Sequence, residues 1–123
     1  MPQITPEEMK AYKRTARARW QSEQKQLGDR RERAWQLANQ AARLLKEQFG
    51  VQRVVAFGSL IHPDRFTRWS DVDLAAWGLT SSNWLKAIGA VNSLSREIEL
   101  NLVDVTTVSP ELYAVIEREG VNL

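Results

Sequence analysis

Apolar positions divide the chain into a purely helical first part and a mixed second part. Between residues 29 and 49 the apolar side chains recur at helical spacing, at Ala34, Leu37, Ala38, Ala41, Leu44 and Leu45. This spacing predicts a helix with one buried face. Residues 5–27 carry only a thin apolar stripe, made of Met9, Tyr12, Ala16 and Trp20. We therefore expect a first helix that is exposed or docked on another molecule.

Capping residues mark the expected ends of these two helices. Thr5 precedes Pro6 and stands three residues before Glu8, which is the pattern of a capping box. Gly28 predicts a break between the helices, and Gly50 predicts the end of the second. The chain then divides into a basic helical extension, residues 1–28, and a folded domain, residues 29–123.

After residue 50 the pattern changes to short strands that alternate with helices. Strands are expected at residues 51–57, 71–77 and 98–105, and helices at residues 83–95 and 110–119. The expected fold is an α+β domain with a small mixed β-sheet of at least three strands and helices on one face.

Composition excludes several kinds of chemistry. The 123 residues include no Cys and a single His, His62, so disulfides, thiolate metal sites and sites that need two imidazoles are ruled out. There is no apolar run of about 18 residues that would span a membrane. The first residues also lack a secretory pattern. We expect a cytoplasmic protein with no membrane partner.

Charge is distributed unevenly along the chain. Residues 1–50 contain 11 Lys or Arg and 6 Asp or Glu, a net charge of +5, whereas residues 51–123 contain 6 and 9, a net charge of −3. A basic helical region is most often a solvated face. Nucleic acid and an acidic protein surface are the alternatives.

Two short motifs in the second part are candidates for phosphate and metal chemistry. Gly58 and Ser59 directly follow a predicted strand, where a glycine lets the backbone approach a phosphate and the serine adds a hydroxyl. Asp71 and Asp73 point to the same face of the next strand. Two carboxylates about 4 Å apart repel each other by about 4 kcal/mol at an effective dielectric constant near 20. The pair is therefore either a solvated strand end or a divalent-ion site.

Taken together, the two motifs resemble a known superfamily. Phe57-Gly58-Ser59, eleven intervening residues and Asp71-Val72-Asp73-Leu74 are similar to the signature of the DNA polymerase β-type nucleotidyltransferases, and most of all to the minimal nucleotidyltransferases. The resemblance covers residues 34–123 and includes the stretches 100–105 and 109–121. It implies a polymerase β-like core in which Gly58 and Ser59 hold the phosphates of ATP. It also implies that Asp71 and Asp73 ligate two Mg²⁺ ions.

The position of the third family carboxylate departs from that pattern. Asn101 stands where the family has Asp, and an Asn keeps a carbonyl oxygen but removes one negative charge. Strand alternation places Glu99 on the same face as Asn101, so Glu99 is a candidate substitute ligand. Arg68, in the loop that follows Ser59, is a further candidate for contact with the triphosphate; a solvated loop charge is the alternative.

The resemblance also implies a function. Minimal nucleotidyltransferases are commonly encoded beside helical HEPN-type toxins, with which they pair in hetero-oligomers. The resemblance therefore implies an antitoxin that transfers AMP from ATP to a Tyr hydroxyl of its toxin, the product of the neighbouring gene. Because of Asn101, the alternative is a catalytically impaired relative that neutralises or scaffolds a partner by binding alone. A third hypothesis is a module that binds nucleic acid through the basic helices, with an affinity that falls steeply with salt.

Overall fold

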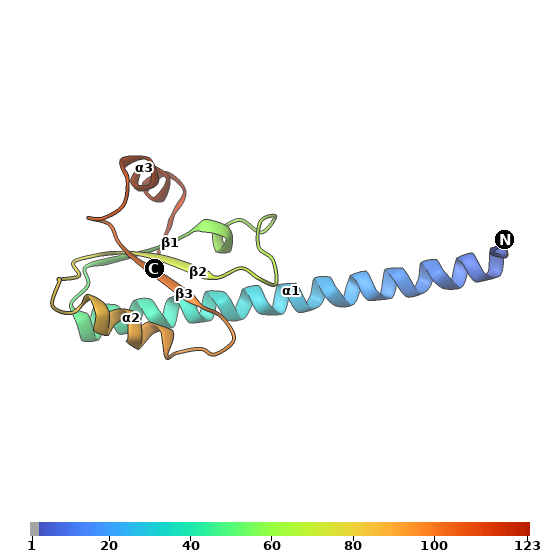
Figure 1. The fold of residues 1–123 in the computed structure, drawn as a ribbon, viewed down its shortest axis with the longest axis horizontal. Coiled ribbons are helices and arrows are strands. Elements are labelled where there is room, and N and C mark those ends of the chain that lie inside the picture. The colour runs from blue at the N-terminus through green and yellow to red at the C-terminus, as the bar shows by residue number, and fades with distance from the viewer. Residues whose placement is uncertain (1–2) are drawn as a thin grey trace.

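The computed structural model describes residues 3–123 and contains three α-helices and four β-strands (Figure 1). The elements in chain order are α1 Pro6–Phe49, β1 Arg53–Phe57, the 3-10 helix η1 Gly58–Ile61, β2 Val72–Trp77, α2 Trp84–Asn92, β3 Leu100–Asp104, α3 Pro110–Glu119 and β4 Val121–Asn122. The three predicted strands and the last two predicted helices are confirmed to within a few residues. The sequence patterns did not predict η1 or the short β4.

Helix α1 is continuous, so the predicted break at Gly28 is wrong. The capping box at its start is confirmed, because the Glu8 backbone N–H donates to Thr5 Oγ1 at 3.1 Å and the Thr5 N–H donates to Glu8 Oε2 at 3.2 Å. Gly50, with φ of 68°, closes the other end. Gly28 does not have a positive φ. A glycine inside a helix costs only about 1 kcal/mol, which the helix formers on both sides outweigh.

The sheet is mixed and has the strand order β3-β2-β1-β4. Strand β1 is antiparallel to both β2 and β4, whereas β2 and β3 are parallel. In this register Asp73 lies beside Phe57 on one side and beside Asn101 on the other. The end of β1 and the starts of β2 and β3 therefore meet at one edge of the sheet.

Helices cover both faces of the sheet. The larger core cluster joins α1 and α2 to one face through residues such as Ala38, Leu45 and Leu74. On the other face, α3 contributes Ile116 to a smaller cluster with Val55, Ala75 and Val105 (Figure 1). The expectation of helices on one face is therefore right for α1 and α2 and wrong for α3. Since β2 presents small or apolar residues on both sides, both sides need cover.

The N-terminal half of α1 projects away from the domain. Residues 3–26 are all exposed, and Leu27 is the first partly buried position. Figure 1 shows this half extending past the end of the domain at which η1 lies. Within residues 3–123, no helix is long and apolar enough to cross a membrane.

Candidate functional site

The turn after β1 is built for close approach between backbone and carboxylate. Gly58 has a φ of 76°, a region that L side chains rarely adopt. A Cβ atom at this position would collide with the Asp73 carboxylate. Ser59 follows within η1 and is half-buried. Only glycine therefore fits at position 58, and it brings the Gly58-Ser59 turn against Asp73, as the motif predicts.

Asp71, Asp73 and Asn101 form one polar cluster at the same edge. The Asn101 side-chain amide donates to Asp73 Oδ1 at 3.1 Å and to Asp71 Oδ2 at 3.5 Å. Burial raises the pKa of the Asp73 carboxyl; the hydrogen bond from Asn101 opposes this shift, and the charge of Asp71 adds to it. Asn101 thus occupies the position expected of a third carboxylate and bridges the other two.

The chemistry of this cluster fits a divalent cation. Among the ion pairs of residues 3–123, none involves Asp71 or Asp73, so no protein cation offsets the two neighbouring carboxylates. The two carboxylates are the hard donors that Mg²⁺ prefers when substrate phosphates complete its shell. Asn101 now points its amide nitrogen at both carboxylates, so its oxygen would join them as a donor only after the amide rotates. The same part of the chain contains no group of three or more Asp, Glu, His or Cys residues that would hold a metal by itself.

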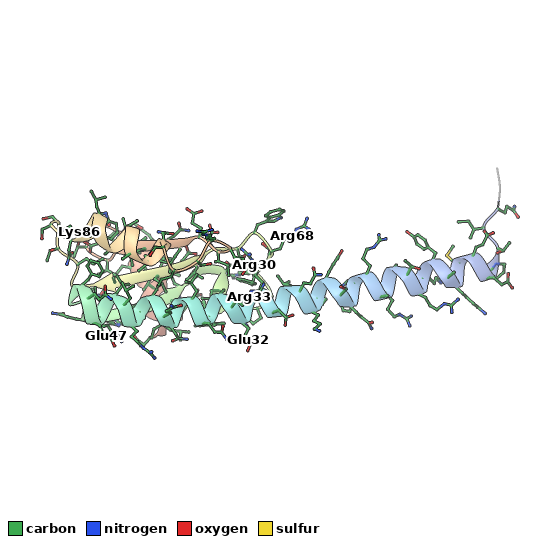
Figure 2. The ribbon with its side chains drawn as sticks, turned by 90° about the horizontal axis from the view of Figure 1, so that it is seen from below. Arg30, Glu32, Arg33, Glu47, Arg68 and Lys86 are labelled. Carbon is green, nitrogen blue, oxygen red and sulfur yellow. The ribbon has the colours of Figure 1, made fainter. Side chains whose placement is uncertain are left out.

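Glu99 is not part of a three-carboxylate cluster. It lies just before β3, is exposed, and lines a neighbouring cavity of about 470 Å³ that also reaches Asp71. The same cavity is lined by three arginines, Arg30, Arg68 and Arg96. Figure 2 shows Arg30 and Arg68 near the point at which α1 leaves the domain. Because Asp71, Glu97 and Glu99 line the same cavity, the arginines are balanced by an equal number of carboxylates, and a pocket of mixed charge opens beside the carboxylate pair.

Two arginines of α1 hold the ends of the loop that joins the motifs. Arg31 donates from Nε and Nη2 to the Leu60 carbonyl at 3.1 and 2.8 Å, one residue after Ser59. Arg30 donates from Nη2 to the Ser70 carbonyl at 3.1 Å, one residue before Asp71. Sequence analysis missed both roles. Arg31 and Leu60 are 29 positions apart and Arg30 and Ser70 are 40 positions apart, and no local pattern links residues at such separations.

Solved structures of similar fold are toxin–antitoxin proteins, whereas no protein-family model and no curated protein matches the chain. A structure of toxin–antitoxin MntA-HepT is 20% identical, with 72% of this chain and 69% of that chain covered at a TM-score of 0.53. A toxin–antitoxin structure with AMP-PNP is 22% identical, with coverage of 69% and 70% and a TM-score of 0.57. A MntA-HpeT mutant with two aspartates replaced by glutamate is 20% identical, with the same coverage and a TM-score of 0.56. At these identities the likeness establishes the fold, which is the one that the resemblance implied.

Proposed function

We propose that the chain is a minimal nucleotidyltransferase of the polymerase β type that acts as an antitoxin. It transfers AMP from ATP to a hydroxyl group, a Tyr side chain of a cognate HEPN-type toxin, with which it forms a hetero-oligomer in the cytoplasm. The observation that carries the proposal is the convergence of the Gly58-Ser59 turn with Asp71 and Asp73 at one sheet edge. The transferase domain is residues 29–123, and residues 1–28 are an extension of it.

Each residue at this edge has a role in that reaction. Asp71 and Asp73 would hold two Mg²⁺ ions, which supply charge neutralisation for the transferring phosphate. Gly58 and Ser59 bind the phosphates of ATP through backbone and hydroxyl donors, and Arg68 approaches them from the rim of the cavity. The hydroxyl oxygen of the acceptor bonds to the α-phosphorus as the bond to pyrophosphate breaks, and the hydroxyl proton passes to solvent. Protein residues thus mainly position the reactants.

The solved structures of similar fold support this proposal. One was determined with AMP-PNP, an ATP-like nucleotide, and another carries a double Asp-to-Glu replacement two positions apart, the spacing of Asp71 and Asp73 here. Both are described as toxin–antitoxin structures. Nucleotide binding and a toxin partner are therefore consistent with this fold and with the residues at its edge.

Mass spectrometry tests the proposal directly. The full chain is incubated with ATP, Mg²⁺ and the product of the neighbouring gene. The expected result is one added AMP on a Tyr of that product, absent with Asp71→Asn or Asp73→Asn. Unmodified product in a mixture where the two proteins bind each other would refute the transferase.

Asn101 favours a second candidate, an impaired relative that neutralises its partner by binding alone. In that case the wild-type chain binds MgATP and its partner, transfers no AMP, and protects cells equally well with Asp73→Asn. If transfer does occur, Glu99→Ala decides whether Glu99 contributes the missing carboxylate: unchanged transfer excludes that role.

A further inference from the structure

A single apolar face runs along the whole of α1. At 3.6 residues per turn, Met9, Ala16 and Trp20 lie within about 40° of the line defined by the buried Ala34, Ala38 and Leu45. Tyr12 flanks this line. We call Met9, Tyr12, Ala16 and Trp20 the seam. The seam is thus the continuation of the face with which α1 packs on the sheet.

The seam has no cover in this structure. Tyr12 is 72% exposed and Trp20 is 61% exposed, whereas Ala34 and Leu45 on the same face are fully buried. Most helices in proteins are stabilised by packing of their apolar face rather than by intrinsic propensity. A second molecule that covered the seam would supply this packing.

The surface next to the seam leads to the candidate site. Beyond Trp20 comes a cavity of about 580 Å³ lined by Leu27, Phe66, Arg30 and Arg68. The two arginines also line the cavity that reaches Asp71. Figure 2 shows Arg30 and Arg68 at the end of the domain from which the projecting half of α1 extends. A molecule that runs along the seam and continues past Trp20 would therefore reach the cavities that lead to Asp71.

Charged side chains beside the seam restrict what covers it. Lys10, Lys13, Arg14 and Arg17 together line a shallow basic groove along the helix. Lys13 and Arg17 lie directly next to the seam on the helical projection. A second copy of this chain would bring like charges together. A nucleic acid would satisfy the cations and could stack bases on Tyr12 and Trp20, but it would leave the aliphatic Met9 and Ala16 without the apolar cover that a protein helix supplies.

We propose that the seam docks a helix of the acceptor protein. This helix presents an apolar stripe to the seam and acidic side chains to Lys13 and Arg17, the groove mode of helix recognition. This proposal rests on the proposed function, because it takes the acceptor of AMP to be a protein. Docking on the seam holds the acceptor next to Asp71 and so raises the rate of transfer by proximity.

Isothermal titration of the full chain with the product of the neighbouring gene, without ATP, tests the docking. Tyr12→Ala with Trp20→Ala should weaken binding at least about tenfold. Lys13→Glu with Arg17→Glu should weaken it by a similar factor and flatten its salt dependence. The control is Ala18→Ser with Ser22→Ala, on the side of the helix opposite the seam, which should bind as the wild type does. MgATP affinity, titrated separately, should be the same in all four proteins.

Several results would overturn the docking proposal. The docking proposal is wrong if the seam variant binds the product of the neighbouring gene as tightly as the wild type does, or if the wild type does not bind it. It is also wrong if the wild type binds a short single-stranded RNA or anionic lipid vesicles and the seam variant does not. Failure of the transferase is distinguishable from these. Seam-dependent binding without AMP transfer keeps the docking and refutes the enzyme, whereas equal transfer by the seam variant keeps the enzyme and refutes the docking.

Discussion

Replacing Asn101 with Asp would convert the bridging amide into a third carboxylate. The Asn101 amide nitrogen now lies 3.1 Å from Asp73 Oδ1 and 3.5 Å from Asp71 Oδ2, and a carboxylate oxygen in its place would face two like charges. At about 3 Å each pair repels by about 5 kcal/mol at an effective dielectric constant of 20, and by about 1 kcal/mol in bulk water. Because Asn101 is exposed and its side chain can rotate away, we expect Asn101→Asp to lose about 1–3 kcal/mol of unfolding free energy in EDTA.

Thermal unfolding with and without Mg²⁺ measures this effect. A loss of 1 kcal/mol lowers Tm by about 4 °C for a domain of this size. Added Mg²⁺ should raise the Tm of Asn101→Asp more than that of the wild type, because an additional carboxylate strengthens binding to the folded state alone. Asn39→Asp, on an exposed face of α1, is the matched control for an added charge. If Asn101→Asp unfolds like the control in EDTA, and Mg²⁺ shifts neither protein, the three side chains do not form a cation site.

Three further changes test the surroundings of the site. Gly58→Ala should lose about 1–3 kcal/mol of stability because of its positive φ and the contact with Asp73, whereas Gly28→Ala should gain up to about 1 kcal/mol; chemical denaturation that ranks them the other way would contradict the structure. Arg31→Ala should weaken MgATP binding in calorimetry at least about tenfold by releasing the Leu60 carbonyl, with Arg43→Ala as an exposed control. The hydrogen bond from Arg33 lowers the pKa of Glu97, so the pair stabilises the fold above the ordinary carboxyl pKa and loses this contribution as pH falls through the lowered value. Glu97→Gln should therefore flatten the acid side of stability against pH, and an unchanged slope would contradict this.

Local periodicity was sufficient to predict most of the second part of the fold. The period of two in residues 72–77 places Asp73 on the face opposite to Leu74, and pairing of β2 with β3 then sets Asn101 beside Asp73. These features depend on the order of residues along one strand or on the register between two strands. Both can be inferred from the alternation of apolar and polar residues in the sequence. The departure from the family pattern at Asn101 came from the resemblance to the family and not from periodicity.

Features that depend on tertiary packing could not be predicted from local sequence patterns. The position of α3 on the second face depends on the apolar residues of β1 and β2 that remain uncovered. The contacts of Arg30 with Ser70 and of Arg31 with Leu60 join segments whose spacing carries no period.

The continuity of α1 has a consequence for how a partner and the site communicate. The same helix carries the seam in its projecting half and, immediately after Gly28, the arginines that hold the residues next to Ser59 and Asp71. A continuous helix resists bending at Gly28 better than two helices joined by a flexible glycine would, although long helices still curve gently. A partner docked on the seam as proposed would therefore restrain the helix on which Arg30 and Arg31 lie. Occupancy of the seam would in this way bear on the geometry of the Gly58-Ser59 turn and the carboxylate pair, although these lie on different elements of the fold.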